Sequence, residues 1–227
     1  MKNIFSIALI ALAVNGTASA LENNIPDGFS LKDRISFDYD EESCGQLDFR
    51  LDQNDDCTVE FLDFFAASDF EPYRECDLTI TVDLPKGLRI APSLLAIEGE
   101  YEVAKEGKVS IQANYGLDYY DKVSIAKTFY GPHHKRVASD AFLLTKSWNR
   151  DQLSQCGGKA VFKGKFILGA KRGWDAESEI TIDKSEREQL ATWGWDYEPC
   201  HVKRPKHCSG IAGDPELADV YPECHEW

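Results

Sequence analysis

Residues 76–87 read Cys-Asp-Leu-Thr-Ile-Thr-Val-Asp-Leu-Pro-Lys-Gly. Apolar and polar side chains alternate from Cys76 to Leu84, and a period of two places the apolar side chains on one face of an extended chain. This pattern predicts a half-buried antiparallel strand. Pro85-Lys86-Gly87 supplies a fixed φ and then a residue free to adopt positive φ. We therefore expect a turn that returns the chain to the same sheet.

Two pairs of alternating stretches predict hairpins on either side of this strand. Leu47–Leu51 and Thr58–Phe65 flank a polar turn, which predicts a first hairpin. Leu95–Val103 and Val109–Tyr115 flank a turn at Lys105-Glu106-Gly107, which predicts a second. In the second hairpin the polar face is rich in carboxylates.

Shorter alternating runs predict the remaining strands: Leu88–Ile90, which is expected to stop at Pro92, Val123–Tyr130, Ala141–Thr145, Lys159–Ala170 and Ile180–Ile182. No segment shows a long apolar stripe of helical period. About nine or ten short strands separated by regular turn signals predict an all-β fold. We expect an antiparallel β-sandwich followed by a loop-rich C-terminal tail that disulfides hold in place.

The first twenty residues indicate export. Lys2 precedes an apolar run from Ile4 to Val14, and Ala18-Ser19-Ala20 fits a signal-peptidase site. The run is shorter than a bilayer span, so we expect a secreted or periplasmic protein without membrane insertion. The net charge of −14 disfavours nucleic acid as a partner, because a field of that sign repels phosphates.

Seven cysteines follow the expected cleavage site: Cys44, Cys57, Cys76, Cys156, Cys200, Cys208 and Cys224. In an oxidising compartment cysteines form disulfides more often than metal or nucleophilic sites. Seven is an odd number, so at least one thiol is left over within the chain. We expect four regions: a signal peptide (1–20), an extended rather than packed N-terminal segment (21–43), the sandwich (44–200) and a tail rich in Cys and His (201–227).

The chain resembles the small exported proteins of fungi and bacteria catalogued as domain of unknown function 4360. The resemblance rests on Arg74–Leu78, Leu84–Gly87, Thr128–Pro132, Trp148, Cys156-Gly157, Trp193 and Cys200. It implies an exported, β-rich domain with disulfides, and it carries no established activity or catalytic residue.

The resemblance also bears on the cysteines. It implies two bridges among Cys44, Cys76, Cys156 and Cys200, and four cysteines allow three pairings. Pairing of the tail cysteines Cys208 and Cys224 with each other would leave Cys57 as the odd thiol.

Aromatic residues near the end of the chain are candidates for binding a ligand: Trp174, Trp193, Trp195 and Tyr197. Aromatic faces stack on the apolar faces of sugar rings, so these four could form a platform. Aromatic side chains that cap the core are the commoner alternative. The row Glu98, Glu100 and Glu102 could bind cations, although such a row is usually a solvated face.

Two patterns resemble metal sites, and both have better explanations. Asp52, Asn54, Asp56 and Asp63 match positions of a calcium loop, but Cys57 stands where that loop needs glycine. A polar hairpin turn explains them better. The Cys-His pairs of the tail match no zinc-finger spacing, and disulfides compete for their sulfurs. We expect neither a metal nor a cofactor.

The catalytic inventory is negative, because the chain contains no nucleophile elbow, zinc-protease motif, phosphate loop or dinucleotide fingerprint. No catalytic residue is assigned. We expect a non-enzymatic binding or structural protein of the cell surface whose partner is a polysaccharide or a protein. The alternative is a secreted hydrolase of glycans, which needs two carboxylates facing one cleft.

Overall fold

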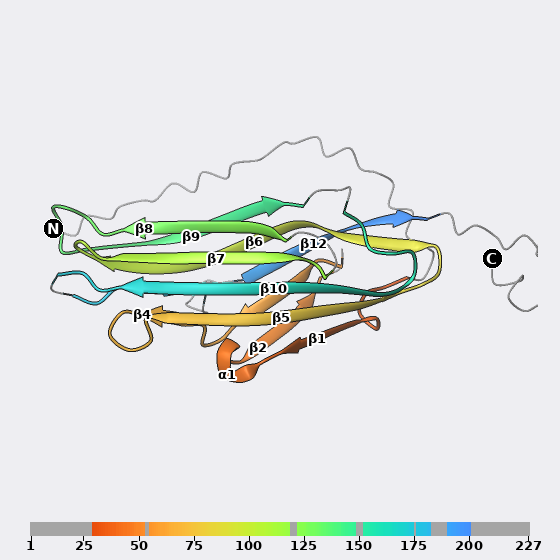
Figure 1. The fold of residues 1–227 in the computed structure, drawn as a ribbon, viewed down its shortest axis with the longest axis horizontal. Coiled ribbons are helices and arrows are strands. Elements are labelled where there is room, and N and C mark those ends of the chain that lie inside the picture. The colour runs from red at the N-terminus through yellow and green to blue at the C-terminus, as the bar shows by residue number, and fades with distance from the viewer. Residues whose placement is uncertain are drawn as a thin grey trace, which may run out of the picture.

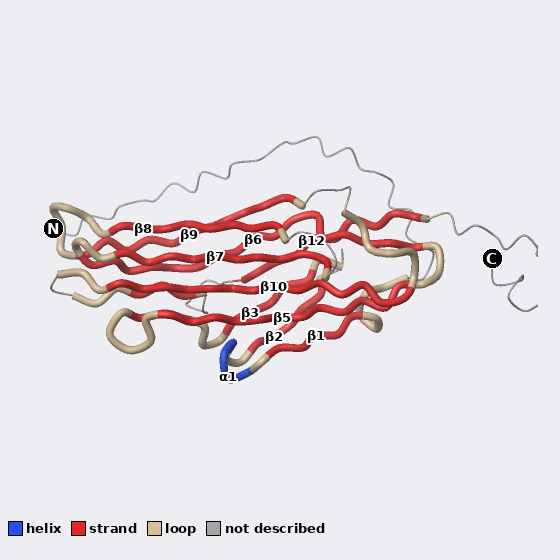
Figure 2. Tube along the Cα trace, in the orientation of Figure 1, coloured by secondary structure: helices blue, strands red, loops and turns tan. Residues whose placement is uncertain are grey.

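Two antiparallel β-sheets packed face to face make up this protein in a computed structural model that describes residues 29–52, 55–118, 122–148, 152–174, 176–182 and 190–200. Their strands run along the long axis of the molecule (Figure 1). Within the described ranges the one helix is α1 (Glu41–Cys44), and the rest is strand or loop (Figure 2). The predicted all-β sandwich is confirmed. No helix of the described residues is suited to cross a bilayer.

The first sheet has five strands in the order β1 (Ile35–Tyr39), β5 (Tyr73–Leu84), β10 (Gly158–Lys171), β7 (Lys108–Leu117) and β8 (Val123–Tyr130). The second sheet has seven. Six follow the order β2 (Leu47–Leu51), β3 (Cys57–Phe61), β12 (Leu190–Pro199), β6 (Leu88–Ala104), β11 (Glu179–Thr181) and β4 (Phe65–Ala67), and β9 (Val137–Ser147) pairs with the other side of β6.

The core lies between the sheets and rests on the alternation from which the fold was predicted. The apolar residues of β5 from Cys76 to Leu84 are all buried. On β10, Phe162 and Phe166 point inward and meet two tryptophans of the opposite sheet. Phe166 lies 5.9 Å from Trp193 and Phe162 lies 4.9 Å from Trp195, measured between ring centroids. Such edge-on aromatic contacts add to the free energy gained from burial.

The turn after β5 forms as predicted, but its destination differs. Gly87 adopts a φ of 85°, and the Leu88 N–H donates to the Pro85 carbonyl at 3.3 Å. The chain then enters β6, which belongs to the second sheet. The expectation of a return to the same sheet is wrong, because alternation fixes which face of a strand is apolar and not which strand lies beside it.

The second predicted hairpin is also wrong, for the same reason. β6 and β7 follow one another around the turn at Lys105-Glu106-Gly107, yet β6 pairs with β9, β11 and β12, and β7 pairs with β8 and β10. The two strands face each other across the core. The first hairpin is confirmed, since Leu47 pairs with Phe61 and Leu51 with Cys57.

Pro92 does not end a strand. β6 is 17 residues long, from Leu88 to Ala104, and runs through Pro92 without a break. Pro92 pairs with Trp195 where the register with β12 shifts after Gly194, and β9 pairs with β6 only from Leu94 onward. A proline, which has no N–H to donate, is tolerated at such an irregularity.

Part of the expected N-terminal segment is packed, which corrects the prediction for residues 21–43. β1 pairs with β5 in register, and Leu31 is fully buried. Phe37 stacks on Phe49 with ring centroids 3.9 Å apart. Ile35, Phe37 and Tyr39 alternate and share one face of β1. This short run was overlooked because the many acidic residues nearby make the segment polar overall.

β12 was not predicted as a strand. It lies between β3 and β6 in the interior of the second sheet, and Trp193 and Trp195 lie on its inward face. The expected tail at 201–227 lies outside the described residues.

Candidate binding site

Two of the four aromatic candidates belong to the core, which is the commoner alternative given in the sequence analysis. Trp193 and Trp195 are 3% and 8% exposed, which leaves no ring face for a sugar. Tyr197 is half-buried with its ring 5.7 Å from that of Phe29, and burial raises the pKa of its hydroxyl. Trp174 is different, because 78% of its surface is exposed. The structure therefore does not bring the four together as one platform.

Trp174 instead shares one end of the sandwich with three aromatic residues that the sequence did not single out. Phe70 is 79%, Tyr130 74% and Tyr73 56% exposed. Phe70 lies between β4 and β5, Tyr73 begins β5, Tyr130 ends β8, and Trp174 follows β10. These elements meet at the left end of Figure 1. We call Phe70, Tyr73, Tyr130 and Trp174 the aromatic end.

Backbone hydrogen bonds lock the loops of the aromatic end to one another. The Trp174 N–H donates to the Lys105 carbonyl at 3.0 Å, and the Lys105 N–H donates to the Arg136 carbonyl at 2.8 Å. The Gly131 N–H donates to the Gly107 carbonyl at 3.0 Å. The turn between β6 and β7 thus holds the loops after β8 and β10, so the exposed rings stand on a fixed base.

Close packing and charged contacts also hold the loops of the aromatic end in place. A side chain at Gly131 would place its Cβ 1.8 Å from the Ala104 carbonyl oxygen, so only glycine fits there. The Lys105 ammonium lies 5.7 Å from the centre of the Trp174 ring, a cation–π contact that orients the indole. Arg172 and Asp69 form an ion pair at 3.1 Å that joins the loop of Trp174 to that of Phe70.

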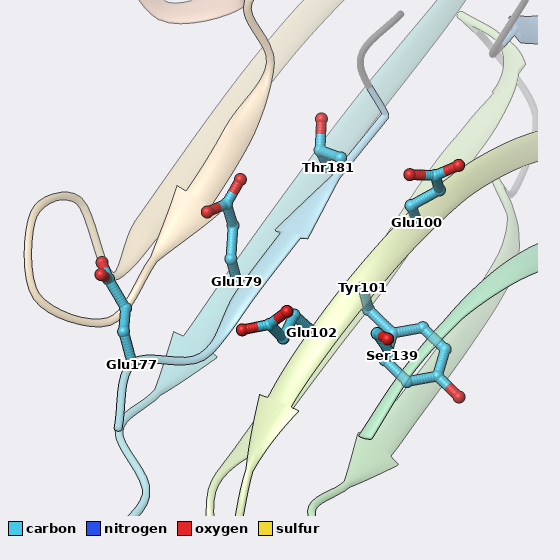
Figure 3. A pocket seen from close by; sticks show the side chains of 7 residues that line it. All are labelled: Glu100, Tyr101, Glu102, Ser139, Glu177, Glu179 and Thr181. Carbon is cyan, nitrogen blue, oxygen red and sulfur yellow. The ribbon is translucent and has the colours of Figure 1, made fainter. Parts of the chain in front are cut away.

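A second feature is a hollow of about 320 Å³ on the outer face of the second sheet (Figure 3). We call it the glutamate groove, and it is lined by Glu100, Tyr101, Glu102, Ser139, Glu177, Glu179 and Thr181. Glu102 and Glu179 are register partners on β6 and β11, which brings their carboxylates to the same hollow. Burial, with a contribution from Asp140, raises the pKa of Tyr101.

The groove contains part of the predicted glutamate row, since Glu98 is not among its lining residues. Gly99 lies beneath it, and a Cβ there would lie 2.4 Å from the Thr181 carbonyl oxygen. The described residues contain no group of three or more acidic, His or Cys side chains arranged to hold a metal.

The acidic residues around Asp52 form the turn between β2 and β3. The Asp56 N–H donates to the Asp52 side chain at 2.9 Å and the Asp52 N–H donates to the Asp56 carbonyl at 3.1 Å. Asp55 adopts a φ of 64° within this turn. The hydrogen bonds fit the polar hairpin turn that was preferred over a calcium loop.

Four cysteines form two disulfides, Cys44–Cys76 and Cys156–Cys200. This is the pairing that the sequence left open. Cys57 is a free thiol and is fully buried, so its sulfur does not reach a second chain from the folded protein. Cys208 and Cys224, with the tail histidines, lie outside the described residues.

The model of one protein family, described as domain of unknown function DUF4360, matches residues 44–200. The chain belongs to the DUF4360 family. The matched stretch contains the sandwich strands from β2 to β12, both disulfides and the aromatic end. No curated protein matches the chain.

Several solved structures resemble this DUF4360 domain weakly. They include TmCBM61 in complex with β-1,4-galactotriose, at 12% identity and a TM-score of 0.24, covering 73% of this chain and 88% of that one. Another is described as "CBM4 structure and function", at 8% identity and a TM-score of 0.25, covering 70% and 86%. A third is bacteriophage CBA120 tailspike protein 4, at 8% identity and a TM-score of 0.20, covering 73% and 19%. Similarities with TM-scores this low support no inference about the fold or the ligand of this chain.

Proposed function

We propose that this DUF4360 protein is an exported, non-enzymatic protein that binds polysaccharide through its aromatic end. The observation that carries the proposal is the gathering of four exposed aromatic side chains at one end of the sandwich. A soluble domain normally buries tryptophan and phenylalanine, and clustered exposed aromatic surface marks an interaction site. Aromatic faces suit the apolar faces of sugar rings.

The order of the loops supports the same proposal. Binding costs less conformational entropy when the contacting residues are already held in place. Trp174 is fixed by its backbone hydrogen bond to Lys105 and by the ammonium near its ring. The two disulfides and the signal-like N-terminus are compatible with an exported protein that meets extracellular glycans.

Sedimentation with insoluble polysaccharide tests the proposal. Purified protein is mixed with cellulose, with chitin and with isolated cell walls, with and without chelator, and the bound fraction is measured. We expect chelator-resistant binding to at least one of them. Trp174→Ala is expected to weaken it about tenfold or more, as truncation of a central aromatic contact does.

Leu143→Ala is the matched control, because Leu143 is a large apolar residue that is 60% exposed on β9, outside the aromatic end. It should bind as the wild type does. Binding that survives both Trp174→Ala and a Phe70→Ala/Tyr130→Ala double variant would overturn the proposal. Binding that chelator abolishes would move the site away from the aromatic rings.

The glutamate groove favours a second candidate, hydrolysis of a glycosidic bond. Residues directly opposite on antiparallel strands have Cβ atoms about 5 Å apart, which brings carboxylates within the roughly 5 to 9.5 Å range that glycosidases use. Glu102 and Glu179 are such a pair.

Release of reducing ends from soluble glycans tests this candidate. A hydrolase would lose activity in Glu102→Gln and in Glu179→Gln but keep it in Glu98→Gln. Glu98 is an exposed residue of the same strand that does not line the groove. Absence of product with the wild type would remove the candidate.

A further inference from the structure

Two lysines lie directly opposite each other on the outer face of the first sheet. Lys108 begins β7 and Lys171 ends β10, and the two are register partners. Both are exposed. Side chains opposite each other on neighbouring strands have Cβ atoms about 5 Å apart, and like charges there destabilise the sheet.

No carboxylate offsets this repulsion within the part of the chain that the structure describes. Two other lysines on the same face of β10 are paired: Lys163 with Asp118 at 2.6 Å, and Lys165 with Asp77 at 3.1 Å. Lys108 and Lys171 form no ion pair with any described residue. What sets Lys108 and Lys171 apart is that two such lysines face each other, in a chain with 39 acidic residues and a net charge of −14.

The two lysines border a hollow of about 180 Å³ that is also lined by Pro72, Ser110, Gly169 and Ala170. Gly169 lies between Tyr73 and Ser110 in the register of β5, β10 and β7. A Cβ at Gly169 would lie 2.9 Å from the Ser110 hydroxyl oxygen, so glycine keeps this floor open. The hollow thus combines two positive charges with a hydroxyl that can donate a hydrogen bond.

The hollow adjoins the aromatic end. Tyr130 is the register partner of Lys108 on the far side of β7, and Tyr73 is that of Gly169 on the far side of β10. A ligand that contacts these tyrosines therefore passes beside both ammonium groups.

We propose that this hollow binds the anionic group of an acidic polysaccharide, a carboxylate or a phosphate held between Lys108 and Lys171. The inference rests on the proposed function and specifies the class of glycan. The negative charge of the whole protein does not oppose it strongly, because charges more than about 8 Å away are largely screened at physiological ionic strength. An anion between the two ammonium groups also removes their mutual repulsion.

Titration of amide chemical shifts with single sugars tests this site apart from the aromatic end. The probes are glucuronate, glucose 6-phosphate and uncharged glucose, and the signals are the amides of Ser110, Gly169 and Lys171. We expect saturable shifts with at least one charged sugar and none with glucose at the same concentration. Shifts with glucuronate alone would identify a carboxylate glycan, and shifts with the phosphate alone a phosphorylated one.

Lys108→Gln/Lys171→Gln is expected to weaken this binding about three- to tenfold, as loss of two exposed charge contacts does. Lys122→Gln/Lys159→Gln is the control, because it removes two exposed lysines from the opposite end of the sheet. Equal binding by both double variants, or no shift at Gly169 with either anion, would overturn the inference. Neither result changes what sedimentation shows for binding of polysaccharide through Trp174. The two experiments can therefore fail independently, one for the lysine hollow and the other for the proposed function.

Discussion

At the scale of single residues, Cys57 is a buried thiol whose environment favours its protonated form. Burial raises the pKa of this thiol from 9.0 to about 12, and Asp56 adds to the shift. The folded protein therefore keeps a proton that the unfolded chain releases above pH 9.0. The stability contributed by this group is complete below that pH and is lost as the pH rises toward about 12.

We predict that the free energy of unfolding falls more steeply with pH in the wild type than in Cys57→Ala above pH 9.0. The difference in slope approaches about 1.4 kcal/mol per pH unit. Urea unfolding at closely spaced pH values measures it. Equal slopes in the two proteins would show that the thiol ionises equally in both states.

Trp174 and Trp193 are the same residue type in opposite environments, and they make a direct comparison. Trp193→Ala removes a core ring that packs against Phe166, and it should lower the free energy of unfolding by about 3 to 5 kcal/mol. Trp174→Ala removes an exposed ring and should change it by less than about 0.5 kcal/mol. Denaturant unfolding of both variants checks this. A large loss with Trp174→Ala would assign that ring a structural role.

At the scale of strands, the disulfide Cys156–Cys200 ties the start of β10 to the end of β12 and so joins the two sheets. It spans 44 residues of sequence. Loop-closure entropy predicts a loss of about 4 kcal/mol for Cys156→Ala/Cys200→Ala. Urea unfolding of this double variant measures the loss. An unchanged midpoint would mean that contacts between the sheets already restrict this part of the chain.

The strands themselves could be predicted from the sequence far better than their partners. Alternation in β5 and β10 marked their buried faces, because a period of two is a property of one extended chain. It holds no information on whether the next strand crosses to the opposite sheet, as β6 does after Gly87. β12 was missed because Trp193 and Trp195 were considered as a sugar platform or as caps of the core, and not as alternating residues on one face of a strand.

The candidate site could also be predicted only in part: single residues could be named, but not which residues lie together. Trp174 could be named from the sequence as an aromatic residue in a polar loop. Phe70, Tyr73 and Tyr130 could not be joined to it, because they come from two other parts of the chain, the β4–β5 connection and the end of β8, that only the sheet pairing brings together. The signal available was their position beside turns, as in Tyr130-Gly131-Pro132.

At the scale of the whole molecule, the buried tryptophans, the glutamate groove and the aromatic end occupy different parts of the sandwich. Trp193 and Trp195 pack in the interior, the glutamate groove lies on the outer face of one sheet, and the aromatic end gathers the loops (Figure 1). The central claim is that a glycan covers the rings of this end, above all Trp174. Trp148, Trp193 and Trp195 are buried, so Trp174 is the tryptophan of the described residues that a soluble quencher reaches.

Acrylamide quenching of tryptophan fluorescence is the most direct test of that claim. The measurement uses a Trp227→Phe background, since Trp227 lies outside the described residues, and compares the protein alone with the protein saturated with the soluble form of the polysaccharide it binds. We predict that the ligand protects the quenchable fraction and that Trp174→Phe abolishes both quenching and protection. Full quenching of Trp174 in the bound protein would contradict the account.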